Sequence, residues 1–196
     1  MTRREVGGLD LRSDNMKSLI IIAAIVLGLG GLAYLIYLNV REPPPIRGVV
    51  TFARPSRGHD NSVLYPASDL PPVGGTHHDQ WQVCGIYNEP IASENAVHSL
   101  EHGAVWITYN PDVLDANDIV ELKNIVRGDN FVLTSPYPGL KSPVVLTAWG
   151  LQLELDSVSD RRIQSFIERY RVGPQTPERG ATCGPGSGGG IGQPVE

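Results

Sequence analysis

The feature that most constrains this chain is an uncharged, apolar run of 23 residues near its N-terminus, from Ser18 to Val40. An α-helix rises about 1.5 Å per residue, so such a run crosses the roughly 30 Å hydrocarbon core of a bilayer. A cleaved signal peptide is the alternative, but the run is longer than the apolar region of a signal peptide, and no small-residue cleavage site follows it. The run therefore predicts one transmembrane helix over residues 18–40.

Charges beside this helix predict its orientation. Four basic residues precede it, whereas Arg41 is the only basic residue directly after it. Because cytoplasmic flanks carry the excess of Lys and Arg, we expect residues 1–17 to form a cytoplasmic tail. The rest of the chain should then lie outside the cell membrane. Its acidic residues outnumber its basic ones, so no nucleic-acid partner is expected. The expected partners are the membrane, through residues 18–40, and a membrane-protein complex.

The outer part divides by composition into a linker, one domain and a tail. Residues 41–58 contain a proline-rich spacer, which favours the polyproline II conformation, and a first strand. Residues 59–175 have the mixed composition of a globular domain. Residues 176–196 are rich in Gly and Pro, which predicts a flexible tail.

The spacing of apolar residues predicts the core of the domain. Alternation with a period of two indicates strands, and the i, i+3, i+4 stripe indicates amphipathic helices. The expected elements are a strand at 104–110, a helix at 115–126, a strand at 131–135, one longer strand at 143–155 and a helix at 157–171. This β-α-β-β-α order with a mixed sheet predicts an α+β fold.

Histidine and carboxylate side chains gather in one short segment, His98-Ser-Leu-Glu-His102. The glycine that follows it typically ends a helix, so we expect a helix here. On a helix, His98 and His102 lie one above the other, within reach of a single ion. Glu101 points about 100° away from His102 around the helix, so we expect it beside the ligands rather than among them.

A further pair of histidines lies upstream, in a loop behind Pro71 and Pro72. A long loop in a compact domain is usually functional or disordered, and the paired imidazoles favour a function. Three histidines suit zinc or copper and leave a coordination position open. The predicted metal ligands are His77, His98 and His102, with His78 and Glu101 as secondary candidates.

The chain has two cysteines, Cys84 and Cys183. Outside the cytoplasm disulfides persist, so a Cys84–Cys183 disulfide is the first hypothesis. The alternative is Cys84 as a thiolate ligand beside the histidines, as in blue-copper sites. Neither methionine of the chain, Met1 or Met16, lies in the outer part to serve as an axial ligand.

Three phrases in this order resemble a known family. They are Pro71-Pro72-x-Gly74-Gly75-x-His77, then Gly85-Ile86-Tyr87, then His98-Ser99-Leu100-Glu101-His102-Gly103. They resemble the bacterial membrane-anchored family called domain of unknown function 3105, over roughly residues 60–175. Where that family usually carries a serine, this chain has Gly74. The resemblance implies that the recurring histidines correspond to His77, His98 and His102, with Glu101 beside them, but it implies no activity.

The sequence is compatible with three functions from different classes. The first is a membrane-anchored extracytoplasmic protein that binds copper or zinc without catalysis. The second is a metal-free interaction or accessory subunit of a membrane complex, in which the histidines are structural. The third is a zinc-dependent hydrolase, because His98-x-x-Glu101-His102 matches the H-x-x-E-H pattern with the glutamate as general base. That reading needs a downstream carboxylate ligand, Glu168 or Glu178, and the sequence favours a binding protein over an enzyme.

Overall fold

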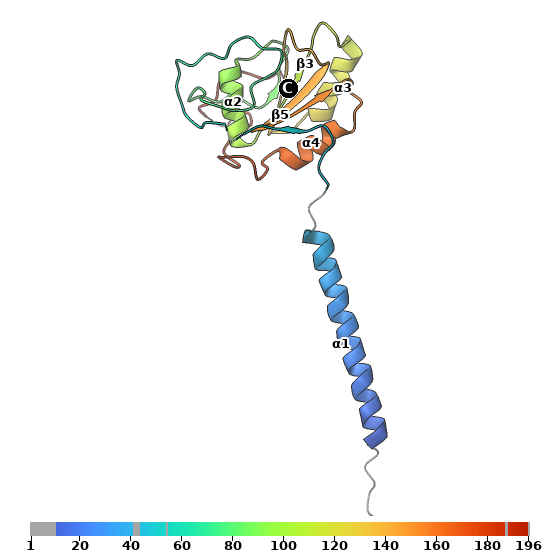
Figure 1. Cartoon of the computed structure of the whole chain (residues 1–196). Coiled ribbons are helices and arrows are strands. Elements are labelled where there is room, and N and C mark those ends of the chain that lie inside the picture. The colour runs from blue at the N-terminus through green and yellow to red at the C-terminus, as the bar shows by residue number, and fades with distance from the viewer. Residues whose placement is uncertain (1–10, 41–43, 54, 187, 196) are drawn as a thin grey trace, which may run out of the picture. The chain divides into compact units, whose positions relative to one another are not determined.

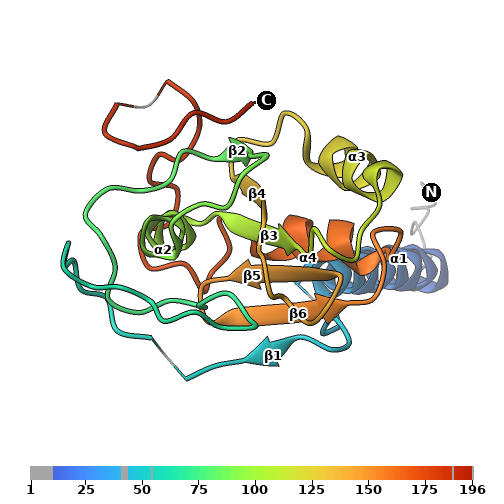
Figure 2. The same ribbon diagram turned by 90° about the horizontal axis from the view of Figure 1, so that it is seen from above.

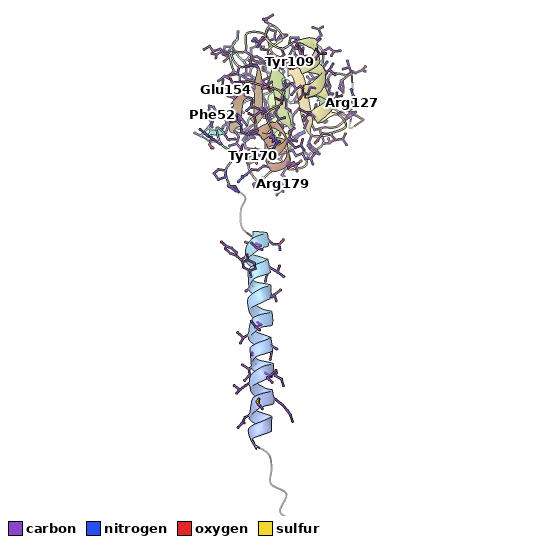
Figure 3. The ribbon with its side chains drawn as sticks, turned by 90° about the vertical axis from the view of Figure 1, so that its right-hand side faces the viewer. Phe52, Tyr109, Arg127, Glu154, Tyr170 and Arg179 are labelled. Atoms are coloured by element: carbon purple, nitrogen blue, oxygen red, sulfur yellow. A yellow bond between two sulfur atoms is a disulfide. The ribbon has the colours of Figure 1, made fainter. Side chains whose placement is uncertain are left out.

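The N-terminal helix α1 (Leu11–Val40) forms a unit separate from the residues after Pro44. The computed structural model describes residues 11–40, 44–53, 55–186 and 188–195. Side chains of α1 are exposed along residues 15–40 (Figure 3). The stretch Asn15–Val40 has a mean hydropathy of 2.7 and is long and apolar enough to cross a membrane, a property that signal sequences share.

The helix differs from the sequence prediction at its start. It begins at Leu11 rather than at Ser18, so the last residues of the predicted cytoplasmic tail are helical. Residues 1–10 of that tail, and 41–43 of the predicted linker, lie outside the described residues.

The second unit is built on a six-stranded mixed sheet with the order β1-β6-β5-β3-β4-β2. Its strands are β1 (Val50–Thr51), β2 (Gly85–Ile86), β3 (Val105–Tyr109), β4 (Val132–Pro136), β5 (Val144–Ala148) and β6 (Leu151–Leu155). Strand β4 is parallel to both β2 and β3, whereas β5 is antiparallel to β3 and β6. The helix α3 (Ala116–Val126) makes the crossover that a parallel β3–β4 pair requires. The expected α+β class with a mixed sheet is confirmed.

The long strand predicted at 143–155 is in fact a hairpin. Strands β5 and β6 pair antiparallel, with Ala148 opposite Leu151, so the chain reverses at Trp149 and Gly150. Gly150 has a φ of 71°, a left-handed conformation that glycine adopts without strain. The continuous apolar pattern hid this turn, because a single glycine was the only sign of it.

The two faces of the sheet are covered differently (Figures 1 and 2). On one, called the apolar face here, Val105 and Ile107 of β3 pack with buried residues of α3 and of α4 (Arg162–Tyr170). On the other, the histidine face, Trp106 of β3 packs beneath α2 (Ser93–His102) and the loops around it. Alternate side chains of one strand thus enter different cores, as the pleat of a strand requires.

The C-terminal tail lies along residues 81–86 rather than apart from the domain. Backbone amides of Val83 and Cys84 donate to the carbonyls of Ile191 and Cys183, at 2.9 and 2.7 Å. A disulfide joins Cys84 to Cys183, with their Cα atoms 5.2 Å apart. Both sulfurs are therefore committed to each other, which excludes the alternative of Cys84 as a thiolate ligand. Composition predicts flexibility here and carries no sign of these contacts, because residues 81–86 and Cys84 are remote from the tail in sequence.

Candidate metal centre

The helix α2 places its polar side chains inside the protein. All its residues from Glu94 to His102 are buried, although the segment is rich in polar residues. It ends at Gly103, whose φ of 112° allows its amide to bond back to the carbonyl of Leu100. A Cβ atom there would lie 3.0 Å from Cα of Val172, so the close approach also favours glycine. This packing buries the imidazoles of His98 and His102 and the carboxylate of Glu101.

Three histidines are held in the same tautomer by backbone carbonyls. A carbonyl only accepts hydrogen bonds, so a ring nitrogen facing one must carry the proton. In each case that nitrogen is Nδ1, which leaves the lone pair of Nε2 for another partner. The bonds run from Nδ1 of His77 to Gly75 (2.7 Å), of His98 to His78 (2.8 Å) and of His102 to Thr182 (2.6 Å).

The bare nitrogens of the two helical histidines face each other. Nε2 of His98 lies 3.0 Å from Nε2 of His102. With both Nδ1 atoms protonated, two lone pairs meet there, an unfavourable contact unless a cation lies between them. Burial lowers the pKa of His98 to about 4 and also lowers the pKa of His102, so a proton is a poor candidate for that cation.

Glu101 lies within the cluster, contrary to the expectation that it would stand beside it. Its Oε2 is 3.1 Å from Nε2 of His77, and both atoms are buried without a hydrogen bond. Its Oε1 accepts a hydrogen bond from Nε of Arg57 at 3.0 Å. The i, i+3 spacing from His98 explains the position, because residues three apart differ by only about 60° around a helix.

Charge at Glu101 and His77 is coupled. Burial alone would raise the pKa of Glu101, but the nearby His77 and Arg57 outweigh it and hold that pKa at about 2. Burial likewise acts to lower the pKa of His77, but the carboxylate of Glu101 and the carbonyl of Gly75 outweigh it, and the pKa is raised. The carboxylate is therefore ionised throughout the physiological range, as a metal ligand must be.

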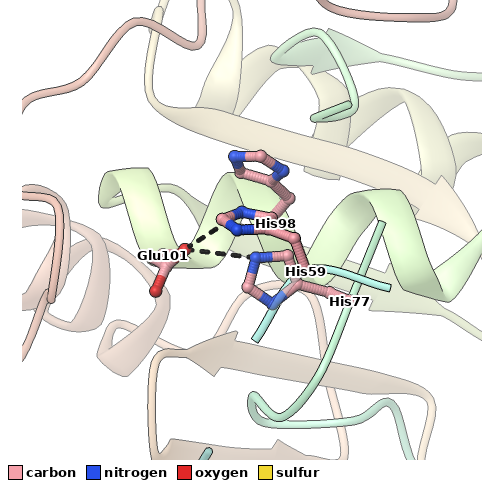
Figure 4. Close-up of side chains that lie close together, drawn as sticks. All are labelled: His59, His77, His98 and Glu101. Atoms are coloured by element: carbon pink, nitrogen blue, oxygen red, sulfur yellow. Dashed lines mark ion pairs between the residues drawn. The ribbon is translucent and has the colours of Figure 1, made fainter. Parts of the chain in front are cut away.

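His59 is a member of the cluster that the sequence reasoning missed. Its Nε2 lies 3.8 Å from Oε2 of Glu101, and its ring centroid is 4.7 Å from that of His77. A parallel β-bridge between His59 and His77 brings the two loops together. One ligand atom from each of His59, His77, His98 and Glu101 lies within 4.8 Å of all the others (Figure 4).

His78 lies outside this group, although the sequence named it as a secondary ligand. Its Nε2 faces the carbonyl of Val63 at 3.0 Å, and its own carbonyl is the acceptor for His98. Consecutive residues in an extended loop point in opposite directions, so only one of His77 and His78 can face α2. The carbonyl of His78 thus orients the ring of His98, whereas its own imidazole contacts Val63.

Of the two downstream carboxylates considered for a hydrolase, only Glu178 reaches the histidines. Its Oε2 lies 3.7 Å from Nε2 of His102, and its Oε1 lies 3.9 Å from Nη2 of Arg57. Glu168 instead accepts a hydrogen bond from Gln164 on the exposed side of α4.

An open cavity of about 510 Å³ borders the cluster on the side of Arg57 and Trp149. Trp149 meets the ring of His77 edge to face, with 6.0 Å between centroids. The exposed guanidinium of Arg57 and this indole therefore form the partition between the cavity and the buried histidines.

Comparison with known proteins gives one match. Residues 57–185 match the family model described as "Protein of unknown function (DUF3105)". No curated protein and no solved structure matches the chain. The matched span covers more than half of the chain and contains every side chain of the cluster. The chain therefore belongs to the DUF3105 family of proteins of unknown function.

Proposed function

We propose that this protein is a membrane-anchored, extracytoplasmic protein that binds a transition metal, zinc or copper, through the histidines gathered around α2. The observation that carries the proposal is the common tautomer of His77, His98 and His102. Protein ligands of zinc and copper usually donate their second ring N–H to a carbonyl or carboxylate, which orients the other nitrogen toward the ion. All three histidines have that arrangement.

The charge and the donor atoms of the cluster support binding of zinc or copper. Imidazole nitrogens with one carboxylate are the donor set that zinc and copper accept. Glu101 supplies a negative charge, and its buried Oε2 lies 3.1 Å from Nε2 of His77 and 3.8 Å from Nε2 of His59, so it faces two potential ligand nitrogens. The close contact of two bare nitrogens at His98 and His102 is relieved by a cation of any kind that accepts lone pairs.

Two features support the location. The stretch Asn15–Val40 is apolar and long enough to span a bilayer. The disulfide between Cys84 and Cys183 favours an oxidising compartment for the domain that contains it.

The test is the metal content of the full chain, purified in detergent without a histidine tag from cells that export it. The parent protein should retain zinc or copper through dialysis, and a His98→Asn/His102→Asn double variant should lose it. His78→Asn is the matched control, because that imidazole lies outside the cluster, and it should keep the metal.

Two results would overturn the proposal. One is a parent protein that takes up neither ion, which would favour a metal-free interaction subunit. The other is a folded double variant that binds as the parent does. Circular dichroism of each variant separates loss of ligands from loss of fold.

A zinc hydrolase is the second candidate, favoured by the position of Glu178. With His98 and His102, this carboxylate gives the two-histidine, one-carboxylate set of many zinc peptidases. Against it, the general base of that mechanism would be Glu101, whose Oε1 already accepts from the guanidinium of Arg57 and whose Oε2 lies against Nε2 of His77. Zinc-dependent cleavage of casein that Glu101→Gln abolishes would establish the hydrolase, and its absence in the zinc-loaded protein would exclude this substrate class.

A further inference from the structure

The side chains with metal-binding atoms around α2 fall into two groups of the same composition. Each group contains two histidines and one glutamate. The first is His59, His77 and Glu101, and the second is His98, His102 and Glu178. The rings of His77 and His98, one from each group, stand side by side with their centroids 4.8 Å apart.

The first group converges on one carboxylate oxygen. Oε2 of Glu101 lies 3.1 Å from Nε2 of His77 and 3.8 Å from Nε2 of His59. The atoms on His77 and Glu101 are buried and have no hydrogen bond. Donors around a tetrahedral zinc ion, with bonds of about 2.0–2.1 Å, stand about 3.4 Å apart, so these distances suit a shared ion.

The second group converges on His102. Its Nε2 lies 3.0 Å from Nε2 of His98 and 3.7 Å from Oε2 of Glu178. The position of Glu178 is fixed by the backbone, because its amide donates to the carbonyl of Glu101 at 3.0 Å, and the amide of Gly180 donates to the carbonyl of His102 at 3.1 Å. The segment that carries Glu178 is therefore bonded to the end of α2.

One ion does not account for both groups. Six donors exceed the four that zinc usually takes from a protein. Among the described residues, the four side chains whose ligand atoms are mutually within 4.8 Å are His59, His77, His98 and Glu101. This set reaches into the second group through His98 but leaves His102 and Glu178 without a place. Yet His102 has the same carbonyl-held tautomer as His77 and His98, so its Nε2 is equally prepared for a ligand role.

We infer that the cluster binds two transition-metal ions side by side, one held by His59, His77 and Glu101 and the other by His98, His102 and Glu178. This inference rests on the proposed function. Each ion takes one carboxylate and keeps an open position, and Arg57 contacts both carboxylates from the side of the solvent. Two such ions would supply a site for a shared water or anion, as in two-metal hydrolytic sites.

The experiment is zinc stoichiometry of the full chain in detergent, by equilibrium dialysis and elemental analysis. The parent should bind two ions, and Glu178→Gln and His59→Asn should each bind one. Both side chains are partly exposed (43%), so these variants should fold. Glu121→Gln, on the exposed side of α3, is the control and should bind two.

The outcomes separate the two proposals. A parent that binds one ion, with Glu178→Gln unchanged, overturns this inference and leaves the proposed function standing. A parent that binds none overturns both. Two ions that persist in Glu178→Gln and in His59→Asn overturn the assignment of ligands.

A spectroscopic readout tests whether the ions are neighbours. Loaded with Cu²⁺, the parent should give an electron paramagnetic resonance spectrum weakened and broadened by coupling between adjacent ions. His59→Asn and Glu178→Gln should each give the sharp, full-intensity spectrum of an isolated ion. A parent spectrum that is the plain sum of two isolated ions would contradict the side-by-side arrangement.

Discussion

The two faces of the sheet are built from alternate residues of the same strands, but they are covered by different kinds of side chain. The apolar face is closed by the helices α3 and α4, whose buried residues meet aliphatic side chains of the strands. The histidine face is closed by a polar helix and by loops, with Trp106 of β3 bonded through Nε1 to Ser135 of β4. Both faces have an apolar core, but the core of the histidine face is the smaller one, and hydrogen bonds, a disulfide and a buried ionic cluster are added to it.

The difference between the faces separates apolar burial, which stabilises the domain, from the buried ionisable groups. Burial of aliphatic and aromatic side chains is the largest favourable contribution to folding, and the larger of the two buried clusters lies under α3 and α4. A buried group of histidines with a carboxylate costs free energy unless it is satisfied by partners or by an ion. The fold therefore places the histidines and the carboxylate on the face with the smaller apolar core.

Removing a large side chain from the apolar face should have the largest effect on stability. Phe166 of α4 is fully buried and contacts Tyr170 edge to face. Phe166→Ala should lower the free energy of unfolding by about 3–5 kcal/mol, because the cavity is lined by residues that cannot fully collapse. Urea unfolding, followed by tryptophan fluorescence, measures the loss.

The same variant should keep its metal content while folded, because α4 lies on the other face. Val120→Ala, at an exposed position of α3, is the control and should change stability little. Loss of metal from folded Phe166→Ala protein would show that the two faces are coupled rather than independent.

Removing the disulfide should affect both stability and the cluster. Cys84→Ser/Cys183→Ser should destabilise the domain by about 2–5 kcal/mol, as expected for a crosslink that closes a long loop. Thr182, whose carbonyl orients His102, precedes Cys183 directly. Zinc affinity should therefore fall by about 10- to 100-fold, the usual cost of losing the group that orients a ligand. An unchanged zinc titration in the variant would separate the disulfide from the metal centre.

Acid should destabilise the metal-free domain through the histidine face. The pKa of His98 falls from 6.5 to about 4 on folding. Between pH 4 and pH 6.5 the unfolded chain therefore binds a proton at His98 that the folded domain does not. Stability is then complete above pH 6.5 and declines as the pH falls toward 4, by up to about 3 kcal/mol. The raised pKa of His77 acts in the opposite direction and offsets part of the decline.

Urea unfolding at several pH values measures this slope. His98→Asn should flatten it, whereas His78→Asn should leave it in place. A parent protein equally stable at pH 4 and pH 6.5 would contradict the burial of a neutral imidazole at this position.

The smallest effect is expected at the solvent side of the cluster. Arg57→Gln removes the guanidinium that donates to Glu101, and the pKa of that carboxyl should rise. Because the side chain of Arg57 is half exposed (52%), the loss should be only about 1 kcal/mol. Lys141→Gln, which breaks the pair between the exposed Lys141 and the partly exposed Asp69, is the control and should change less. Equal losses in the two variants would show that the buried partner contributes nothing extra.

Much of the apolar face could be predicted from the sequence, because helical stripes and strand alternation are local patterns. Asp115 caps α3 by accepting from the amides of Asn117 and Asp118, which is also a local signal. The hairpin at Gly150 was missed, since both of its strands are almost wholly buried and continue one apolar run.

The histidine face was predicted only in part. The i, i+4 spacing correctly places His98 beside His102, and their shared face is confirmed by the 3.0 Å contact. The positions of His59 and Glu178 depend on loop contacts between residues far apart in the chain, such as the bridge between His59 and His77. Spacing along the sequence carries no information on such contacts.

The central claim is that carbonyl groups hold three imidazoles with Nε2 directed at a metal ion. Long-range ¹H–¹⁵N correlation spectra of the full chain in detergent micelles, labelled at the histidine rings, report the tautomer directly. At pH 8 without metal, His77, His98 and His102 should carry the proton on Nδ1, and zinc should shift their Nε2 resonances. His78 should carry it on Nε2, which faces the carbonyl of Val63, and should not respond to zinc. Protons on Nε2 of the three clustered histidines, with no response to zinc or copper(I), would contradict the account.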